Sequence, residues 1–439
     1  MKVSGVHILY LCVGCIIGWG AFVLPGELFL PKMGLLNSIL GLVLGAVIVG
    51  LIAYNYTFLL SSFPRVGGEF LFTLKVLGRM HGFVCGWFLS LAYLCIIPLN
   101  ATALGLLMDS FGIDFGLKII IYHIGDSPIF LRDVLVGCLS IWFVALINIR
   151  GIYFAFAFQK VLMLVLCGSI LLFFVLMIFN FPLWNNLNTY FENQDFDWHS
   201  VLKVLAIAPW LYVGFDCAVQ VIGEVSCNIK AFRIWTYLSI IIGCVLYILV
   251  ILITALGVSL NEIESFIWAS GESIHRVFGN IGSMILGVGI FGAIMSGING
   301  FFITTSKVLL AMSEHKIVPF ALGNFNVWGI PYRIMIFIAI VSCVMPFFGR
   351  KALLYVVDMS CLGVVIAFLY VGVVSLLIKK KTLGRIAPMS IIGILLGLFF
   401  LALLFAPYSP AVLQIPSLVA LAVWVCLGIG FYVLRFLRK

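Results

Sequence analysis

Apolar runs, each long enough to cross a lipid bilayer as a helix, make up most of the chain. A transmembrane helix needs roughly 20 apolar residues, and such runs follow one another through almost all of the 439 residues. Charged residues are only 9% of the chain, whereas soluble domains carry about 25%. The sequence therefore predicts an all-α polytopic membrane protein with twelve transmembrane helices, at about 6–30, 34–62, 82–108, 130–149, 152–180, 201–226, 232–258, 281–311, 333–349, 352–378, 386–407 and 411–435.

Charged residues alternate in sign from one predicted connection to the next. Basic residues gather in one set of connections, which includes Arg65, Arg79, Arg150, Lys230 and Lys379. The other set carries acidic residues, among them Asp109, Asp114, Glu192, Asp197 and Glu262. Because basic loops stay in the cytoplasm, we expect a multi-pass protein of the cell (inner) membrane with both termini cytoplasmic. The net charge of +9 is then a sign of topology, and no nucleic-acid partner is expected.

Two of the predicted spans are interrupted at corresponding places. Gly18-Trp19-Gly20 breaks the first span, and residues 213–216 break the sixth. Five spans separate the breaks, and an odd number of spans inverts the second unit relative to the first. We therefore predict a five-plus-five inverted repeat with broken helices 1 and 6, a pattern that indicates a transporter's binding site. The first repeat covers 1–180, the second covers 201–378, and two further helices occupy 386–439.

The first break offers backbone groups to a ligand. The half-helix that begins near Gly20 presents free N–H groups with a partial positive charge, which is a favourable place for a carboxylate. Glycine also lets a ligand approach the backbone closely. The alternative is helix packing, since Gly14 and Gly18 form a small-xxx-small pair.

The second break contains a carboxylate at mid-membrane depth. An acidic residue there is a functional hypothesis by default, and Asp216 could bind a substrate ammonium, take part in proton coupling, or hydrogen-bond unwound backbone. Trp210 is either a lid on the substrate or a core aromatic residue. In the eighth span, Asn299 and Phe301 follow small residues and are candidates for a wall of the site.

Two further ionisable residues are candidates for coupling. Glu224 lies eight residues after Asp216 on the same helical face, although a structural ion pair near Lys230 and Arg233 is the favoured interpretation. Lys160 lies inside the fifth span, where it either snorkels to the cytoplasm or serves as a cation site or proton carrier.

The sequence lacks the motifs of an enzyme. No metal-binding His/Glu or Cys/His spacing and no phosphate-binding Gly-x-x-x-x-Gly-Lys loop occurs, so we expect no catalytic residues, no metal and no cofactor. Most of the cysteines lie in apolar runs, as packing residues do. The loop 109–133 contains none, so no disulfide-linked partner subunit is expected.

Four segments resemble motifs of the amino acid–polyamine–organocation (APC) superfamily of permeases. Residues 17–22 are similar to its first-span motif I-G-x-G-I-F, and residues 63–70 to its P-R-x-G-G-E-Y. Residues 212–225 resemble its sixth-span pattern Y-x-G-F-[ED] with a following acidic residue. Residues 299–312 resemble the eighth-span pattern N-G, S-R, A-M. The likeness covers nearly the whole chain, and the four motifs occur in the family's order.

The resemblance implies amino acid or amine transport by alternating access. It also implies roles for individual residues. Backbone groups would hold the substrate carboxylate at Gly18, Trp19, Gly20 and Ala21, and carbonyl groups would hold the amino group at Ile17, Trp210 and Val213, with Gly214 in the second break. Trp210 and Phe301 match aromatic positions of the family's site.

Some positions depart from the family's pattern. Trp19 stands where a small residue is usual, Lys160 lies nearly two turns before the lysine of proton-driven members, and no Thr-Ser pair supports sodium coupling. The function predicted is a secondary amino acid transporter, with a neutral or apolar side chain favoured by the aromatic surroundings. The alternatives are an exchanger or exporter of amines, polyamines or cationic amino acids, and a non-transporting nutrient sensor. The expected partners are an amino acid, a coupled proton or counter-substrate, and the bilayer.

Overall fold

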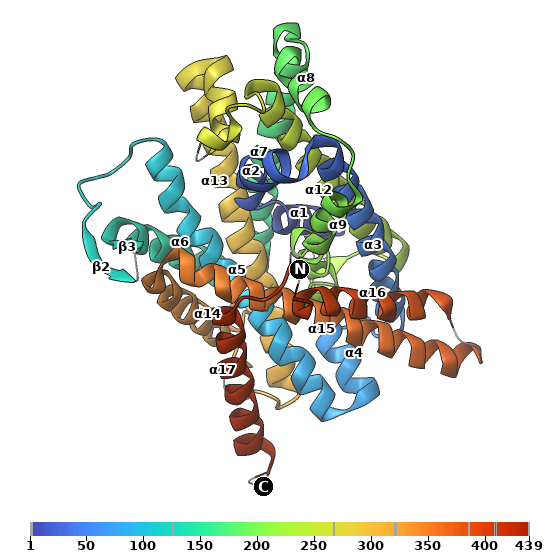
Figure 1. The fold of residues 1–439 in the computed structure, drawn as a ribbon. Helices are drawn as coiled ribbons and strands as arrows, with labels where there is room; N and C mark the ends of the chain where they lie inside the picture. The colour runs from blue at the N-terminus through green and yellow to red at the C-terminus, as the bar shows by residue number, and fades with distance from the viewer. Residues whose placement is uncertain are drawn as a thin grey trace.

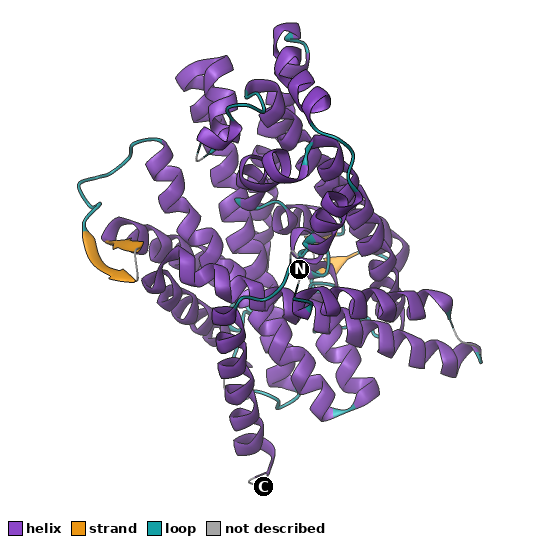
Figure 2. Cartoon of the chain, viewed as in Figure 1, coloured by secondary structure: helices purple, strands orange, loops and turns teal. Residues whose placement is uncertain are grey.

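The structure is a computed structural model that describes residues 3–124, 127–266, 268–319, 323–384, 387–407, 409 and 411–437. It is almost entirely helical (Figure 2). In the described part, nine helices are long and apolar enough to cross a membrane. They are α3 (Leu35–Ser62), α5 (Arg79–Ser110), α6 (Leu131–Arg150), α7 (Ile152–Ile178), α12 (Ile229–Gly257), α13 (Ala269–Glu314), α15 (Gly349–Leu383), α16 (Pro388–Phe405) and α17 (Ile415–Tyr432).

A tenth candidate span is broken near its middle. Helix α1 (His7–Ile16) is followed by its capping residue Ile17, and α2 (Gly20–Leu24) continues into the π-helix η1 (Pro25–Met33). The two halves meet at an angle of 45°. The interruption predicted at Gly18-Trp19-Gly20 is present, and the π-helix after it is a rare form that is frequent at functional sites.

The sixth predicted span is a series of short helices. These are α9 (Trp198–Ala206), α10 (Ala208–Leu211) and α11 (Cys217–Gln220). The turn between α10 and α11 contains Gly214 at φ +123°, a backbone conformation that side chains rarely tolerate. The ninth predicted span is also short, with α14 (Tyr332–Val344) followed by the 3₁₀ helix η5 (Met345–Phe348). The described chain therefore has nine or ten membrane-length helices, and the count of twelve stays a prediction.

Several elements were not expected from the sequence. Helix α4 (Gly68–Leu77) connects α3 to α5, and α8 (Trp184–Asn193) lies in the connection before α9. Strands β2 (Ile120–Ile124) and β3 (Ser127–Phe130) form an antiparallel hairpin at one edge of the molecule (Figure 2). Strands β1 (Val3–Ser4) and β4 (Val225–Ser226) pair in parallel. The remaining short helices are η2 (Phe181–Leu183), η3 (Ile263–Ser265) and η6 (Val433–Leu437).

Helices α5 and α13 form the centre of the packing. Helix α5 lies against both α13 and α15, and α7 also packs on α13. In contrast, α17 projects away from the other helices (Figure 1), and only 11% of its apolar stretch is buried. The broken helix α1 lies beside α12, α7 and α13, so the first break is enclosed by the protein as irregular backbone in a membrane must be.

Candidate functional site

A cavity of about 140 Å³ lies between the two breaks and α5. Engineered apolar cavities of about 150 Å³ hold a benzene molecule, so this space fits a ligand of similar size. It is lined by Cys15, Ile16, Gly18, Trp19, Gly20, Val23, Leu24, Glu27, Ile96, Leu99, Asn100, Trp210, Val213, Tyr247 and Phe301. Six residues predicted for the site are therefore brought together here: Gly18, Trp19, Gly20, Trp210, Val213 and Phe301.

The backbone at the first break has unused hydrogen-bond donors. In the described part of the chain, the amides of Gly18 and Trp19 donate no hydrogen bond to another backbone group or to a side chain. Both residues line the cavity at the start of α2, where the helix dipole favours negative charge. The arrangement can bind a carboxylate through backbone N–H groups.

Trp210 closes the cavity against Gly20. A Cβ atom added at Gly20 would lie 3.2 Å from Cη2 of the Trp210 indole, so any larger residue here would push the indole away from the first break. On the opposite side, Phe301 of α13 lies 5.9 Å from the ring of Tyr93 in α5. The cavity walls therefore combine aliphatic and aromatic side chains, with polar groups supplied by backbone and by Asn100, Glu27 and Tyr247.

Tyr247 of α12 connects the two breaks. Its hydroxyl donates to the carbonyl of Ile16 at 3.2 Å and lies 3.4 Å from that of Leu211. These carbonyls are freed where each helix ends. The Tyr247 side chain is thus hydrogen-bonded to both broken segments.

Asp216 is buried beside the cavity and does not line it. Its Oδ2 accepts a hydrogen bond of 2.6 Å from the Tyr93 hydroxyl, and its Oδ1 accepts one of 2.8 Å from the amide of Gly214. The carboxylate is only 1% exposed. Among the roles considered from the sequence, this geometry fits the one in which Asp216 hydrogen-bonds unwound backbone.

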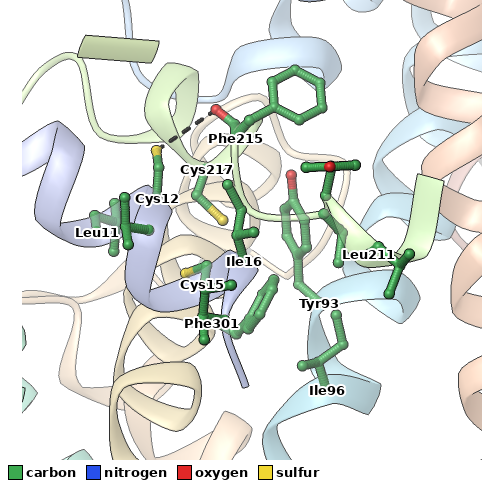
Figure 3. Close-up of a cluster of buried hydrophobic side chains, with 14 of the residues drawn as sticks. Leu11, Cys12, Cys15, Ile16, Tyr93, Ile96, Leu211, Phe215, Cys217 and Phe301 are labelled. Carbon is green, nitrogen blue, oxygen red and sulfur yellow. Dashed lines mark hydrogen bonds between the residues drawn. The ribbon is translucent and has the colours of Figure 1, made fainter. Parts of the chain in front are cut away.

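Thiol groups pack between the same two segments. The Cys12 thiol contacts the carbonyl of Phe215 at 3.7 Å, and Cys15 and Cys217 lie nearby, with their side chains in contact (Figure 3). All cysteines of the chain are free thiols. Of these three cysteines, Cys15 is the one that lines the cavity.

Asn299 lies in a hydrogen-bond network between helices and does not line the cavity. Its Nδ2 donates to Gln159 Oε1 at 2.7 Å and to the carbonyl of Ala155 at 3.0 Å, and its Oδ1 accepts from Asn148 at 2.9 Å. Gln159 in turn donates to Ser296 at 2.8 Å. Asn299 thus ties α13 to α6 and α7. Ile17, Ala21 and Gly214 are likewise buried outside the cavity wall.

The coupling candidates Glu224 and Lys160 lie outside the cavity. Glu224 forms an ion pair with Lys307 of α13, where the sequence had indicated Lys230 or Arg233 as its neighbours. Lys160 is exposed on α7. Neither residue lines the cavity.

A second, wider cavity of about 900 Å³ adjoins the first. Trp19 and Glu27 line both cavities, and the Trp19 ring lies 5.9 Å from that of Trp268. In the described part of the chain, Glu27 forms no ion pair with a lysine or arginine. Any solute that passes between the two cavities therefore passes a free carboxylate and two indole rings.

Charges around the second cavity are mostly neutralised in pairs. Arg276 binds Glu262 at 2.8 Å and Glu272 at 2.9 Å. The Arg276 guanidinium, helped by Ser259, lowers the pKa of Glu262 to about 2. Earlier in the chain, hydrogen bonds from Ser200 and from backbone amides lower the pKa of Asp197, which caps α9. The carboxylates of Glu262 and Asp197 therefore remain charged at neutral pH.

Sequence reasoning missed several lining residues. Asn100 is the polar side chain of an apolar run, which is a signal that could have been used. Glu27 follows the first break by a few residues and is likewise visible in the sequence. Tyr247 and Cys15 carry no such signal, because only the packing of α12 and α1 directs them to the breaks.

Comparisons with known proteins match residues 4–432 to the family "Amino acid permease". A serine/threonine exchanger of Bacillus subtilis (strain 168) is 26% identical over 71% of this chain and 68% of its own length. A branched-chain amino acid permease of Lactococcus lactis subsp. cremoris (strain MG1363) is 24% identical over 97% of this chain and 92% of its own length. A methylthioribose transporter of Bacillus subtilis (strain 168) is 23% identical over 86% of this chain and 81% of its own length. All three are transport proteins, and each match extends over most of both chains.

Proposed function

Since the chain belongs to the amino acid permease family of the APC superfamily, we propose that it is a secondary active transporter that moves amino acids across the cytoplasmic membrane by alternating access. Its relatives are transporters and not enzymes. The proposal includes twelve spans in two inverted repeats, 1–180 and 201–378, with further helices in 386–439 and both termini in the cytoplasm.

One observation supports this function above all others. Gly18 and Trp19 line the cavity, and their amides donate no hydrogen bond in the described part of the chain. Backbone amides are strong donors that need an acceptor when they are shielded from water, and a substrate carboxylate would supply one. The substrate's amino group would then lie toward the carbonyl groups of the two breaks, and its side chain toward Asn100 and Phe301.

The volume of the cavity favours a small substrate. A space of about 140 Å³ suits a ligand near the size of benzene, which points to small neutral amino acids and away from arginine or tryptophan. The names of the serine/threonine and branched-chain relatives agree with neutral substrates. A zwitterion needs no charged side chain in the pocket, and Asp216 does not supply one.

Glu27 favours a second candidate function. Its carboxylate lines both cavities, as the site of an exchanger of amines or cationic amino acids would need. Asp216 no longer supports this alternative, since both of its oxygens are engaged within the protein. Replacing Glu27 by Gln separates the two functions, because only amine exchange would depend on its charge.

Uptake into proteoliposomes tests the proposal. Purified protein would be offered labelled serine, alanine, leucine, arginine, glutamate and putrescine, in the wild-type form and as Gly20→Val. The valine side chain would collide with Trp210, which is only 3.2 Å from a Cβ at this position, so uptake and binding should be abolished. Gly168→Val is the matched control, since a Cβ there meets no atom within 4 Å.

The outcomes distinguish the candidate functions. Uptake of a small neutral amino acid that Gly20→Val abolishes and Gly168→Val preserves would support the proposal. Unchanged affinity in Gly20→Val would place the substrate elsewhere. Binding without uptake by the folded wild type would indicate a sensor.

A further inference from the structure

Polar side chains from three helices gather around Glu69, away from the cavity. Glu69 of α4 is fully buried, and its Oε2 accepts a hydrogen bond from Nε2 of Gln220 in α11. Its other oxygen has no hydrogen bond of normal geometry in the described part of the chain, and neither do Gln220 Oε1, the Tyr56 hydroxyl and Thr73 Oγ1, although Tyr56 interacts with the Glu69 carboxyl group and Thr73 with the Cys85 thiol. Buried polar atoms are nearly always hydrogen-bonded in folded proteins, so four unpartnered atoms around one carboxyl group mark an unusual site.

No cation neutralises this carboxyl group. In the part of the chain that the structure describes, every ion pair is formed by other acidic residues. The ionisable groups that interact electrostatically with Glu69 are acids: Tyr56 of α3, Cys85 and Tyr93 of α5, and Asp216 before α11. The ring of His315, just after α13, packs against that of Phe70, with ring centroids 6.0 Å apart. The Tyr370 hydroxyl of α15 is hydrogen-bonded to the His81 ring. A buried charge is costly without a partner, and a neighbouring carboxylate adds repulsion.

We propose that Glu69 is protonated in this state and carries the proton that drives transport, an inference that rests on the proposed transport function. A neutral carboxylic acid has one donor and one acceptor, which is the complement of a primary amide. With the proton on Oε1, Glu69 donates to Gln220 Oε1 while Oε2 accepts from Gln220 Nε2. This single proton gives partners to two of the four unpartnered atoms.

The location of the pair can link the proton to movement of the broken helix. Gln220 belongs to α11 of the interrupted segment that also contributes Trp210 and Val213 to the cavity. Glu69 belongs to α4, which packs mainly on α5 and α15. When α11 moves relative to α4, the amide leaves the acid and water reaches it. Glu69 then releases its proton to the cytoplasm and becomes a carboxylate.

Each transport cycle takes up one proton on the external side and releases it on the cytoplasmic side. In the outward-facing state, the Glu69 carboxylate takes a proton from external water, and burial against Gln220 holds the neutral acid. In the inward-facing state the same proton leaves to cytoplasmic water. No bond other than the O–H bond forms or breaks, and no redox partner is involved.

The other buried or intramembrane ionisable residues are less suited to this role. Asp216 has a donor on each oxygen, which stabilises its charged form. Glu224 is paired with Lys307, and Lys160 is exposed. Of the four ionisable residues compared here, Glu69 is the one that lacks both a cation and a full set of donors in the described part of the chain.

Glu69→Gln tests the proposal, because glutamine resembles the protonated acid and cannot release a proton. Proteoliposomes with an internal pH dye would report proton entry, and labelled substrate would report uptake. Wild type should show proton entry with substrate and uptake that responds to an imposed pH gradient. Glu69→Gln should retain substrate binding and substrate–substrate exchange but lose both proton responses. Glu192→Gln is the control, since this carboxyl group is exposed on α8 and lines neither cavity of the site, so its loss should leave proton coupling intact.

Infrared spectroscopy gives a second readout that does not depend on transport. A protonated carboxylic acid has a C=O band that Glu69→Gln should remove. If that variant does not fold, Gln220→Met keeps the acid but removes its N–H donor, and the band should move to higher frequency.

Three results would contradict the proposal. They are proton entry that persists in folded Glu69→Gln, wild-type uptake that never responds to a proton gradient, and a carboxylic acid band that neither variant changes. Absence of any binding or exchange by folded wild type is a different result. It would overturn the proposed transport function, and the infrared band would still decide whether Glu69 is protonated.

Discussion

At the scale of single residues, Gly214 shapes the second break by its backbone conformation. Its φ of +123° lies in a region where a Cβ is strained, and a Cβ there would be 2.6 Å from that of Cys15 and 3.0 Å from the amide nitrogen of Ile16. The glycine thus lets the two broken helices touch. It also points its own amide at Asp216.

Gly214→Ala should therefore destabilise the protein and impair binding. Strained backbone of this kind costs about 1–3 kcal/mol, and the contact with Cys15 adds to it. The midpoint of thermal unfolding in detergent should fall, and substrate affinity should fall with it. Gly50→Ala on α3 is the control, because its Cβ would meet only Tyr237 at 3.8 Å. An unchanged midpoint in Gly214→Ala would mean that the turn adapts.

At the scale of elements, an ion pair and a strand pair hold the segment after α11. Strand β4 pairs with β1, and the carbonyl of Glu224 accepts from the Val3 amide at 2.9 Å. The Glu224 side chain binds Lys307 of α13. The broken sixth segment is thereby tied to the amino terminus and to a long helix.

Lys307→Met should destabilise this region more than loss of both charges does. Removing one partner of a buried pair costs about 3–5 kcal/mol, and less is expected here because Glu224 is 27% exposed. We expect a loss of about 1–3 kcal/mol in Lys307→Met, partly restored in the double variant Glu224→Gln/Lys307→Met. The measurement is a double-mutant cycle of thermal unfolding. A double variant that is stable but has lost proton-driven uptake would instead make Glu224 a coupling residue.

Prediction from sequence succeeded for features that are local along the chain. Glycine beside an aromatic residue in an apolar run indicates a break, and both breaks are present at Gly18 and Gly214. Features made by distant contacts could not be predicted. The Tyr93–Asp216 and Glu69–Gln220 hydrogen bonds join residues more than a hundred positions apart. The partner of Glu224 was misjudged for the same reason, since Lys230 is near in sequence and Lys307 is near in space.

At the scale of the whole molecule, the sixth segment decides how the chain crosses the membrane. Helices α6 and α7 are both long enough to span it, which brings the chain back to the side on which it started. The short helices α9, α10 and α11 do not qualify individually. If they cross together as one broken span, the residues before α6 and after α11 lie on opposite sides of the membrane.

Labelling of introduced cysteines with a membrane-impermeant maleimide tests this crossing. Ile119→Cys lies in the exposed loop before α6, where the native side chain is 56% exposed, and Lys230→Cys lies at the exposed start of α12. In intact cells Ile119→Cys should be labelled, and Lys230→Cys only after permeabilisation, because basic connections stay in the cytoplasm. The unsubstituted protein is the control for native thiols such as Cys426, which is exposed on α17. Labelling of both positions from outside would show that α9, α10 and α11 do not cross the membrane. That result would remove the inverted repeat, because the second break would then no longer mirror the first.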